Sequence, residues 1–378
     1  MIAAGPGEWR AAWLEDGVAV ELHVERGDGP PPGSIHLGRV VRRVGGLGAV
    51  LVDIGAERPG FLPLRQPLDE GARVIVTVRR EAQRGKGALL SRQIAESRRV
   101  PLAERAARYD PPAPLDPPPG LAAALALRLP GTPERIAADD VAVLPELRAA
   151  FADAEIVAQA PTDWPIDLDA AFTAALAPSL ALPGGGSLHL EETQAAVLVD
   201  VDTGSGDGDS QQRSVLRTNL EAAAAIARQA RLRQLGGGVI VDFAALEGRG
   251  PRARVLQATT AALVGDPAAP QVLGWTRLGH LEIVRPHRLR PLSEAMLDRP
   301  GPQKSAVALA FECLRAASRE ARAQPAANWR LLIAPAVAAA LRGPAAAALR
   351  ALESRLGRPF AIEIAPAADA HPFDIAPL

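Results

Sequence analysis

Two short apolar segments, residues 198–200 (LVD) and 240–242 (IVD), each end in an aspartate. We interpret both as buried strands, and ligand-binding residues collect at the strand ends of α/β sheets. Neighbouring strands would bring the two carboxylates together, and Mg²⁺, which prefers one or two carboxylates plus waters and phosphate oxygens, would relieve their repulsion. Such an ion can polarise a phosphodiester and activate water. Asp200 and Asp242 are therefore candidate metal ligands, although a strand-end aspartate also commonly caps a turn or a helix.

A different chemistry is suggested by the residues that follow the first aspartate. The segment 202–205 (DTGS) resembles the active-site loop of aspartic proteases. That reaction needs two carboxylates that share one proton. The chain has no second Asp-Thr-Gly or Asp-Ser-Gly segment, so a homodimer would have to supply it, and the chain is far longer than single-domain dimeric proteases. We keep this interpretation as a distant third.

The elements around the aspartates follow an α/β order. Apolar runs predict strands at 187–190, 195–201, 239–241, 271–276 and 281–285. A long amphipathic helix is expected at 209–235, ended by the glycines at 236–238, and a shorter one at 252–263. The apolar face of the long helix is predicted to consist of Leu216, Leu220, Ala223, Ala227 and Ala230. The sequence thus predicts a sheet, backed by helices, that holds the aspartates at its strand ends.

Composition limits the class of protein. The chain has 378 residues, 48% of them hydrophobic and 22% charged, which is typical of a globular protein with two or three domains. A single cysteine excludes a disulfide framework and a multi-cysteine zinc site. No run of 18 apolar residues predicts a membrane span, and the N-terminus does not resemble a signal peptide. We therefore expect a cytoplasmic protein.

Charge is distributed unevenly along the chain. The net charge is −1, but residues 33–108 hold 15 Lys or Arg against seven Asp or Glu, a local charge of +8, and the rest carries −9. A basic block of this kind is expected of a module that binds polyanions. A solvated arginine surface in an arginine-biased composition explains it equally well, since only Lys86 and Lys304 are lysines.

The basic block also has the pattern of a small β-barrel. Short runs rich in Val, Ile and Leu are separated by glycines, a pattern that favours five strands in an OB fold. The runs are at 35–44, 49–54, 61–64, 73–79 and 88–91. The proline-rich segment 111–119 is expected to be a linker. Helical patches are predicted at 145–152 and 168–177. After a turn at 298–304, we expect a C-terminal α/β module with helices at 305–323 and 336–356 and strands at 330–333 and 360–364.

Several of these segments resemble the ribonuclease E/G family. Residues 184–243 (GGGSLHLEETQAAVLVDVDTGS … RTNLEAAAAIARQARLRQLGGGVIVDF) resemble its catalytic core, and 33–64 resemble its inserted S1-like OB domain. The C-terminal LLIAPAVAAALRG and RPFAIEIAPAADAHPFDI resemble its small domain. The resemblance implies a multi-domain α/β fold. It comprises an RNase H-like scaffold (1–32 and 129–181), the S1-like barrel (33–96), a Pro-rich linker or sensor remnant (97–128), a deoxyribonuclease I-like catalytic domain (182–297) and a small C-terminal domain (304–378).

The resemblance also implies an activity and a site. It implies an endoribonuclease that uses Mg²⁺ to cut single-stranded RNA to 5′-phosphate and 3′-hydroxyl ends, in RNA processing or turnover. Asp200 and Asp242 match the family's metal-binding aspartates. Asp202 stands where the family usually has an Asn that organises the site, and an ionised Asp cannot donate the hydrogen bonds of an Asn.

RNA contacts are expected on the barrel. Two aromatic residues and one basic residue of the family's S1-like domain match Leu51, Phe61 and Lys86. Phe61 can stack on a base unless it belongs to the barrel core, whereas Leu51 cannot stack. Further candidate contacts are Arg39, Arg42 and Arg43. A second group of basic residues follows the segment that resembles the catalytic core. We expect these residues either to contact RNA phosphates or to form an ordinary solvated surface. They are Arg285, His287, Arg288 and Arg290.

Two family features are missing from the sequence. The 5′-monophosphate sensor has no counterpart, because the chain passes from 121–129 through Pro130-Gly131 to Glu134 without an Arg-Thr pair. We therefore expect cleavage that is independent of the 5′ end. The Cys-x-x-Cys of the family's zinc link is replaced by 298–303 (DRPGPQ), and Cys313 lies in the next predicted helix, where we expect a core position. A zinc-linked dimer is not expected, and the oligomeric state is left open.

Asp202 and Leu51 keep an alternative function open. A chain that has lost the site-organising Asn and half of its stacking platform could bind RNA on the same fold with weak or no cleavage. The sequence thus predicts a compact nuclease of this family, with an RNA-binding protein as the second interpretation.

Overall fold

The computed structural model describes residues 1–378 except 28, 67, 84, 205–210, 299–302 and 366–371. The chain divides into two compact units. Residues 1–10, 24–160 and 304–378 form the first unit, and residues 11–23 and 161–303 form the second. In the described part, no helix combines the length and the apolar character needed to span a membrane.

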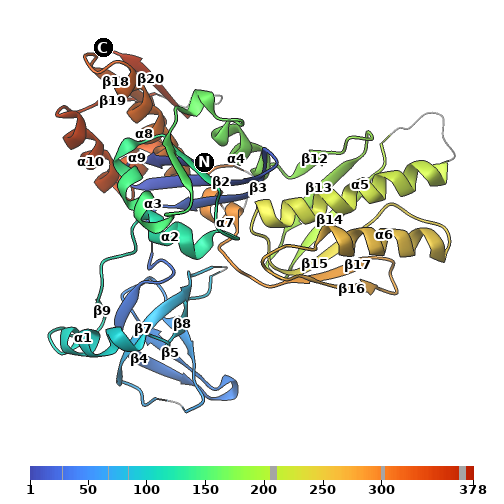
Figure 1. Ribbon diagram of the computed structural model, residues 1–378, viewed down its shortest axis with the longest axis horizontal. Coiled ribbons are helices and arrows are strands. Elements are labelled where there is room, and N and C mark those ends of the chain that lie inside the picture. The colour runs from blue at the N-terminus through green and yellow to red at the C-terminus, as the bar shows by residue number, and fades with distance from the viewer. Residues whose placement is uncertain (28, 67, 84, 205–210, 299–302, 366–371) are drawn as a thin grey trace. The chain divides into compact units, whose positions relative to one another are not determined.

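The first unit contains a closed five-stranded barrel (Figure 1). Its strands are β4 (Ile35–Val44), β5 (Ala49–Asp53), β6 (Gly60–Pro63), β7 (Arg73–Arg80) and β8 (Leu89–Ser91). They pair in the order β5-β6-β8-β7-β4, and β4 pairs with β5 to close the ring. Alternate residues fill the interior, among them Val50, Val52, Leu62, Val76 and Leu90. The predicted barrel and its strand positions are confirmed.

A helix and a short strand flank the barrel in the segment expected to be a linker. Helix α1 (Glu96–Ala106) packs outside the barrel, where Leu102 and Ala106 join Ile35 and Leu37 of β4 in one cluster. Strand β9 (Ala113–Pro114) pairs with the edge of β4, which a proline-rich segment can do without supplying ladder donors.

A second sheet has the strand order β11-β10-β1-β2-β3. These strands are β1 (Ile2–Gly5), β2 (Glu8–Glu15), β3 (Val18–Glu25), β10 (Arg135–Ala138) and β11 (Glu155–Ala158). Helices α2 (Leu121–Arg128) and α3 (Leu144–Ala150) and the short turns η2 (Val141–Val143) and η3 (Pro161–Asp163) lie between or beside them in sequence. The division between the two units falls inside β2 and β3, so the tip of this hairpin, residues 11–23, belongs to the second unit.

The C-terminal module packs helices on a three-stranded sheet, β19-β18-β20. It consists of α8 (Ala306–Ala323), β18 (Trp329–Ile333), α9 (Pro335–Arg342), α10 (Ala346–Leu356), β19 (Ala361–Ile364) and β20 (Phe373–Pro377). The prediction of one helix over 336–356 was wrong, because Gly343 and Pro344 separate α9 from α10 and proline cannot continue the helix. Cys313 is fully buried in this core, as expected, and burial raises the pKa of its thiol to about 12.

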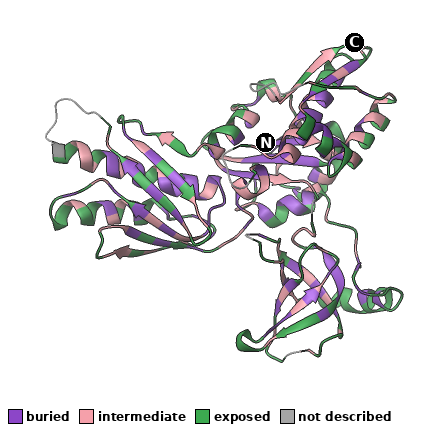
Figure 2. Ribbon diagram, turned by 180° about the vertical axis from the view of Figure 1, so that it is seen from behind, coloured by how far each residue is buried: buried purple, intermediate pink, exposed green. Residues whose placement is uncertain are grey.

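The second unit is built on a six-stranded sheet with the order β12-β13-β14-β15-β17-β16. The strands are β12 (Ser179–Ala181), β13 (Ser187–Glu192), β14 (Ala196–Asp202), β15 (Gly237–Asp242), β16 (Gln271–Trp275) and β17 (Leu281–Arg285). The helices α5 (Gln211–Leu232) and α6 (Arg249–Ala262) cover one face, and α4 (Leu168–Leu176) and α7 (Leu292–Met296) complete the unit. Figure 2 colours the buried residues of these strands purple.

Helix α5 ends differently from the expectation. It stops at Leu232, and Gln234 takes the left-handed conformation (φ 56°) that glycine was expected to supply. The Leu235 N–H donates to the Ala230 carbonyl (3.0 Å) and the Gln234 N–H to Arg231 (3.1 Å), which is a Schellman motif with Gln at its C′ position. Gly237 and Gly238 belong to β15 instead. The expected start of this helix, at 209, lies outside the described residues, as does most of the expected turn at 298–304.

Candidate functional site

Asp200 and Asp242 lie side by side on the sheet of the second unit. Strands β14 and β15 run parallel, and their register pairs Asp200 directly with Asp242. Directly paired residues of neighbouring strands project from the same face of a sheet. Both side chains are exposed. The structure therefore brings together the two carboxylates that the sequence placed at separate strand ends.

Strand alternation decides which face the aspartates occupy. Val197, Val199 and Val201 of β14 are at most 4% exposed and join the core beneath α5 and α6. The residues between them must then face outward, and Leu198 (40% exposed) and Asp200 do so. Hydrophobic burial on the helix side thus holds the carboxylates on the open face.

Asp202 lies on the same open face, one alternation beyond Asp200 and opposite Ser187 of β13. The chain around it is closely packed. A Cβ on Gly186 would come 2.5 Å from the Asp202 carbonyl oxygen, and one on Gly204 (φ 65°) would come 2.1 Å from the Gly185 carbonyl oxygen. These two positions therefore require glycine. Ser205 of the protease-like segment lies outside the described residues.

A histidine near Asp242, interpreted from the sequence as structural or RNA-facing, was not among the predicted site residues. The Nε2 atom of His280 lies 3.8 Å from Oδ2 of Asp242, because His280 directly precedes β17, which runs antiparallel to β15. His189 of β13 is paired with Asp200, and its Nδ1 lies 3.0 Å from the Ser179 hydroxyl. The position of His280 in the sequence could have indicated this contact, because a residue that precedes one strand lies beside the end of an antiparallel neighbouring strand.

The charges of the aspartate group are not balanced by basic side chains. Apart from His280, no ion pair to Asp200, Asp202 or Asp242 occurs in the described part of the chain. Within the same part, no three His, Cys, Asp or Glu side chains are arranged to hold a metal ion. Asp200 and Asp242 therefore form an exposed pair of carboxylates.

The loop after Asp242 is held in place by a buried side-chain amide of helix α5. The side chain of Asn219 on α5 is fully buried, and its Nδ2 donates to the Ala244 carbonyl (2.8 Å) while Ala244 N–H donates to its Oδ1 (3.1 Å). Beside it, Phe243 packs against Trp275 with ring centroids 5.8 Å apart. These contacts fix the chain immediately beyond Asp242. No pattern in the sequence pointed to Asn219.

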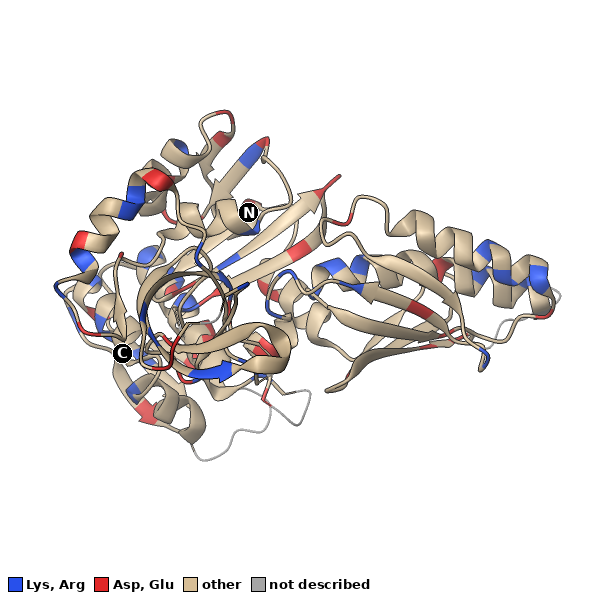
Figure 3. Ribbon diagram, turned by 90° about the horizontal axis from the view of Figure 1, so that it is seen from below, with Lys and Arg blue, Asp and Glu red and all other residues tan. Residues whose placement is uncertain are grey.

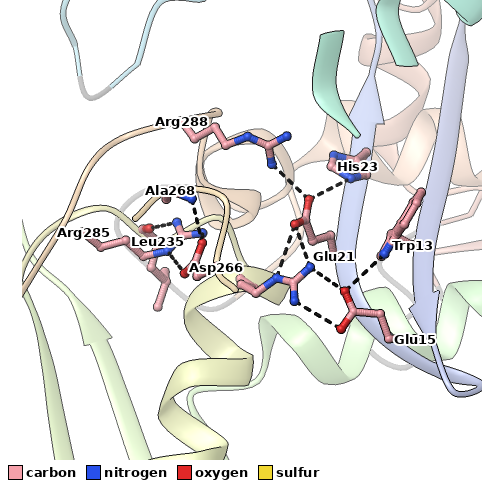
Figure 4. Close-up of polar contacts among 10 residues, drawn as sticks. Trp13, Glu15, Glu21, His23, Leu235, Asp266, Ala268, Arg285 and Arg288 are labelled. Carbon is pink, nitrogen blue, oxygen red and sulfur yellow. Dashed lines mark hydrogen bonds and ion pairs between the residues drawn. The ribbon is translucent and has the colours of Figure 1, made fainter. Parts of the chain in front are cut away.

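The basic group near the catalytic segment is structural rather than free (Figure 4). Arg285 is 1% exposed and forms a bidentate pair with Asp266 at 2.7 and 3.0 Å, so the interpretation of Arg285 as a surface phosphate contact was wrong. Arg288 donates to Glu21 at 3.2 Å, and Arg290 donates to the Glu294 carbonyl at 3.1 Å.

The barrel carries the other predicted contacts. Phe61 is half-buried beside the core residue Leu62, so it lies on the outer surface. The strand pairings place Arg42 opposite Leu51, Leu51 opposite Phe61, and Phe61 opposite Leu89, which makes a row across four strands. We call these four residues the barrel row. Figure 3 colours basic positions blue.

The remaining basic candidates of the barrel differ from one another. Lys86 is exposed in the turn before β8, and Arg39 is exposed on β4. Arg43 instead is tied to the loop before β7, where it donates to the Leu68 carbonyl (3.0 Å) and pairs with Asp69. The structure thus leaves Arg39, Arg42 and Lys86 accessible and engages Arg43.

A family model and several known proteins are similar to parts of this chain. The model of the "Ribonuclease E/G family" matches residues 155–288, the stretch that holds β13 to β17. Ribonuclease G of Escherichia coli is 29% identical over 216 residues, 55% of this chain and 44% of that protein. Ribonuclease E of a Nostoc species is 40% identical over 119 residues, 31% of this chain and 17% of that protein.

A third relative, ribonuclease E of a Synechocystis species, is 34% identical over 137 residues, 36% of this chain and 20% of that protein. The chain thus spans less than half the length of each of these relatives. The matched family segment includes Asp200, Asp202 and Asp242 together with the strands that position them. On this evidence the segment 155–288, which holds these aspartates, is similar to the ribonuclease E/G family.

Proposed function

We propose that this protein is an endoribonuclease that cuts single-stranded RNA in RNA processing or turnover. The observation that carries the proposal is the in-register pair Asp200 and Asp242, exposed on the open face of a sheet that lies within the family-matched segment. The relatives are named for ribonuclease activity. The barrel with its basic surface supplies a separate place to hold the RNA strand.

The donor set fits a magnesium ion. Two carboxylates that have no arginine or lysine partner among the described residues would repel each other and an RNA phosphate. Mg²⁺ is bound by one or two carboxylates plus waters and phosphate oxygens. When bound, such an ion would polarise the phosphodiester and orient the attacking water. Asp200 and Asp242 are the proposed ligands, and Asp202 on the same face would organise the site by accepting hydrogen bonds.

The other residues of the chain position these groups. Asn219 fixes the loop beyond Asp242, and the glycines at 186 and 204 let the chain around Asp202 pack. On the barrel, Phe61 offers a stacking surface and Arg42 and Lys86 offer cations for phosphates. We propose products with 5′-phosphate and 3′-hydroxyl ends, as the family resemblance implies.

The test is cleavage of a U-rich single-stranded RNA with Mg²⁺ or with EDTA, by the unaltered chain and by Asp200→Asn. The proposal expects Mg²⁺-dependent internal cleavage that Asp200→Asn abolishes. Glu191→Gln is the matched control, because Glu191 is exposed on the same face of the sheet but pairs with Leu198 rather than with an aspartate. Cleavage that survives Asp200→Asn would overturn the proposal.

An RNA-binding protein with weak or no cleavage is the second candidate. It is favoured by Asp202, which cannot donate as an Asn does, and by Leu51 in the barrel row, which cannot stack. RNA binding in EDTA without any cleavage in Mg²⁺ or Mn²⁺ would establish this alternative.

Independence from the 5′ end is a further part of the proposal. The segment between the barrel and β10 holds only α1, β9 and α2, with no Arg-Thr pair. One RNA prepared with a 5′-phosphate and with a 5′-hydroxyl should be cut at similar rates, and a strong preference for the phosphate would contradict this. The buried Cys313 is the sole cysteine, so we propose no thiolate zinc link between copies.

A further inference from the structure

A groove on the barrel module has not been used by any function described so far. It measures about 660 Å³ and lies between β7 and α1. Its floor is apolar, and three arginines border it. Its lining includes Arg73 and Ile75 of β7, Arg99 and Leu102 of α1, and Arg92 between β8 and α1.

The charge of this groove is one-sided. No carboxylate lines it, and two acids of the adjacent loop are engaged, since Asp69 pairs with Arg43 and Glu70 accepts from the Arg43 N–H. Arg92 and Arg99 are exposed, and no side-chain partner for either occurs among the described residues. In the described part of the chain, two arginines without an ion pair therefore border the apolar floor, and Glu96 at the start of α1 is the nearest acid in sequence.

The strand register adds a third and a fourth cation. Arg73 on β7 is paired directly with Arg39 on β4, and both are exposed. Like charges in directly opposed positions destabilise a strand pair. Asp53 of β5 is paired with Arg39 on its other side. Arg73 is held in place because it donates to the Ala106 and Tyr109 carbonyls (2.6 and 2.8 Å) beyond the C-terminal end of α1. An anion that bridges the arginines would relieve the repulsion.

The two surfaces of the barrel are connected through β4. Arg42 belongs to the barrel row, and Arg39, on the same strand, borders the arginines of the groove. Single-stranded nucleic acids bind along positively charged grooves that follow their phosphates. The aliphatic floor of this groove offers the bases apolar contact without stacking. A folded acidic protein would need a wider surface than this narrow groove presents.

We propose that the groove between β7 and α1 is a second contact site for single-stranded RNA, in which Arg92 and Arg99 bind phosphates. This inference rests on the proposed function, and it extends the RNA path from the barrel row around β4. The expected consequence is electrostatic, because each neutralised phosphate of a single strand contributes about 0.7 to the slope of log affinity against log salt.

The experiment measures binding of a fluorescent 20-nucleotide oligo(U) RNA in EDTA from 0.05 to 1 M salt. Arg92→Ala/Arg99→Ala should lower the slope by about 1.4, so the gain in affinity from 1 M to 0.1 M salt shrinks about 25-fold. Arg92→Lys/Arg99→Lys should restore most of the slope, since a lysine keeps the charge. The matched control is Arg342→Ala/Arg350→Ala, which removes two exposed charges from α9 and α10.

A slope equal to that of the control variant would overturn the inference, as would failure of the unaltered chain to bind RNA. Circular dichroism melting of each variant checks that the barrel is folded. Because binding is measured without Mg²⁺, a reduced slope in a chain that never cleaves RNA would keep this site and reject the nuclease. Normal Asp200-dependent cleavage with an unchanged slope would keep the nuclease and reject this second contact site.

Discussion

The second unit holds two groups of acidic residues in opposite environments. Asp200 and Asp242 are exposed on the open face, and no arginine or lysine of the described residues pairs with either. Asp266 and Glu21 are buried, and each is matched by arginine: Asp266 by Arg285, and Glu21 by Arg231 and Arg288. Buried carboxylates need partners because desolvation is costly, whereas exposed ones can stay unmatched at little cost. The unmatched pair is therefore available for a ligand, and the matched pair serves the fold.

The largest expected effect tests the exposed pair. Asp200→Asn should reduce RNA cleavage about 1,000-fold, because loss of a metal ligand removes several kcal/mol of charge stabilisation in the transition state. It should leave the midpoint of thermal unfolding in EDTA unchanged or slightly higher, since it removes a like-charge contact. A large drop in that midpoint would show that the exposed pair is structural and would erase the contrast.

The buried pair should respond in the opposite way. Asp266→Asn leaves the guanidinium of Arg285 without its counter-charge in the interior, which should lower the free energy of unfolding by about 3 kcal/mol. Urea unfolding measures this loss. Cleavage per folded molecule should stay near that of the unaltered chain at low temperature, and a selective loss of cleavage with normal stability would contradict the comparison.

Glu21 allows a test by pH. Burial alone raises the pKa of Glu21, but the His23 hydrogen bond and the charges of His23, Arg288 and Arg231 outweigh it and hold the pKa below its usual value of 4.5. A carboxyl with a lowered pKa contributes stability above its unfolded pKa and loses it as pH falls through the folded one. Glu21→Gln should therefore cost about 2 kcal/mol at pH 7.

The difference between the unaltered chain and Glu21→Gln should persist from pH 7 to about pH 5, because protonation of His23 adds a positive charge beside the carboxylate, and it should shrink as the pH falls through the folded pKa of Glu21. Urea unfolding across this pH range measures the difference. A difference that is lost between pH 7 and pH 5 would contradict the role assigned to Glu21.

The smallest effect concerns the barrel row. Leu51→Phe should restore a stacking surface beside Phe61 and raise the affinity for oligo(U) by about 1 kcal/mol, close to fivefold. Leu127→Phe, at an exposed leucine of α2, is the control. Equal affinities of the two variants would show that the row does not bind bases.

The sequence predicted the parts of this fold in which local patterns agree with tertiary packing. Glycines mark the barrel turns, and the valines of β14 alternate with outward residues, so strands and core faces could be read from the chain. The pairing of Asp200 with Asp242 was expected because each follows a short apolar run, although β14 continues past Asp200 to Asp202. The gap between α9 and α10 at Pro344 was overlooked within a run rich in alanine, which favours helix on both sides.

Other features could not be read because they depend on contacts between distant segments. Asn219 faces the Ala244 backbone only after α5 packs on the sheet, and His280 meets Asp242 only through the β15–β17 register. The burial of Arg285 needs Asp266, from a loop in another part of the unit. Gln234 at the end of α5 adopts a conformation that local preference assigns to glycine, and packing overrides that preference.

The shared register of β14 and β15 links correct folding to chemistry. The same alternation buries Val199 and Val241 and exposes Asp200 and Asp242, so a slip of one residue would exchange the two sets. A misregistered chain would then place carboxylates beneath the helices and lose its core at the same time. Refolded preparations should accordingly contain either fully competent molecules or unfolded ones, and the specific activity of the folded fraction should not depend on the refolding yield.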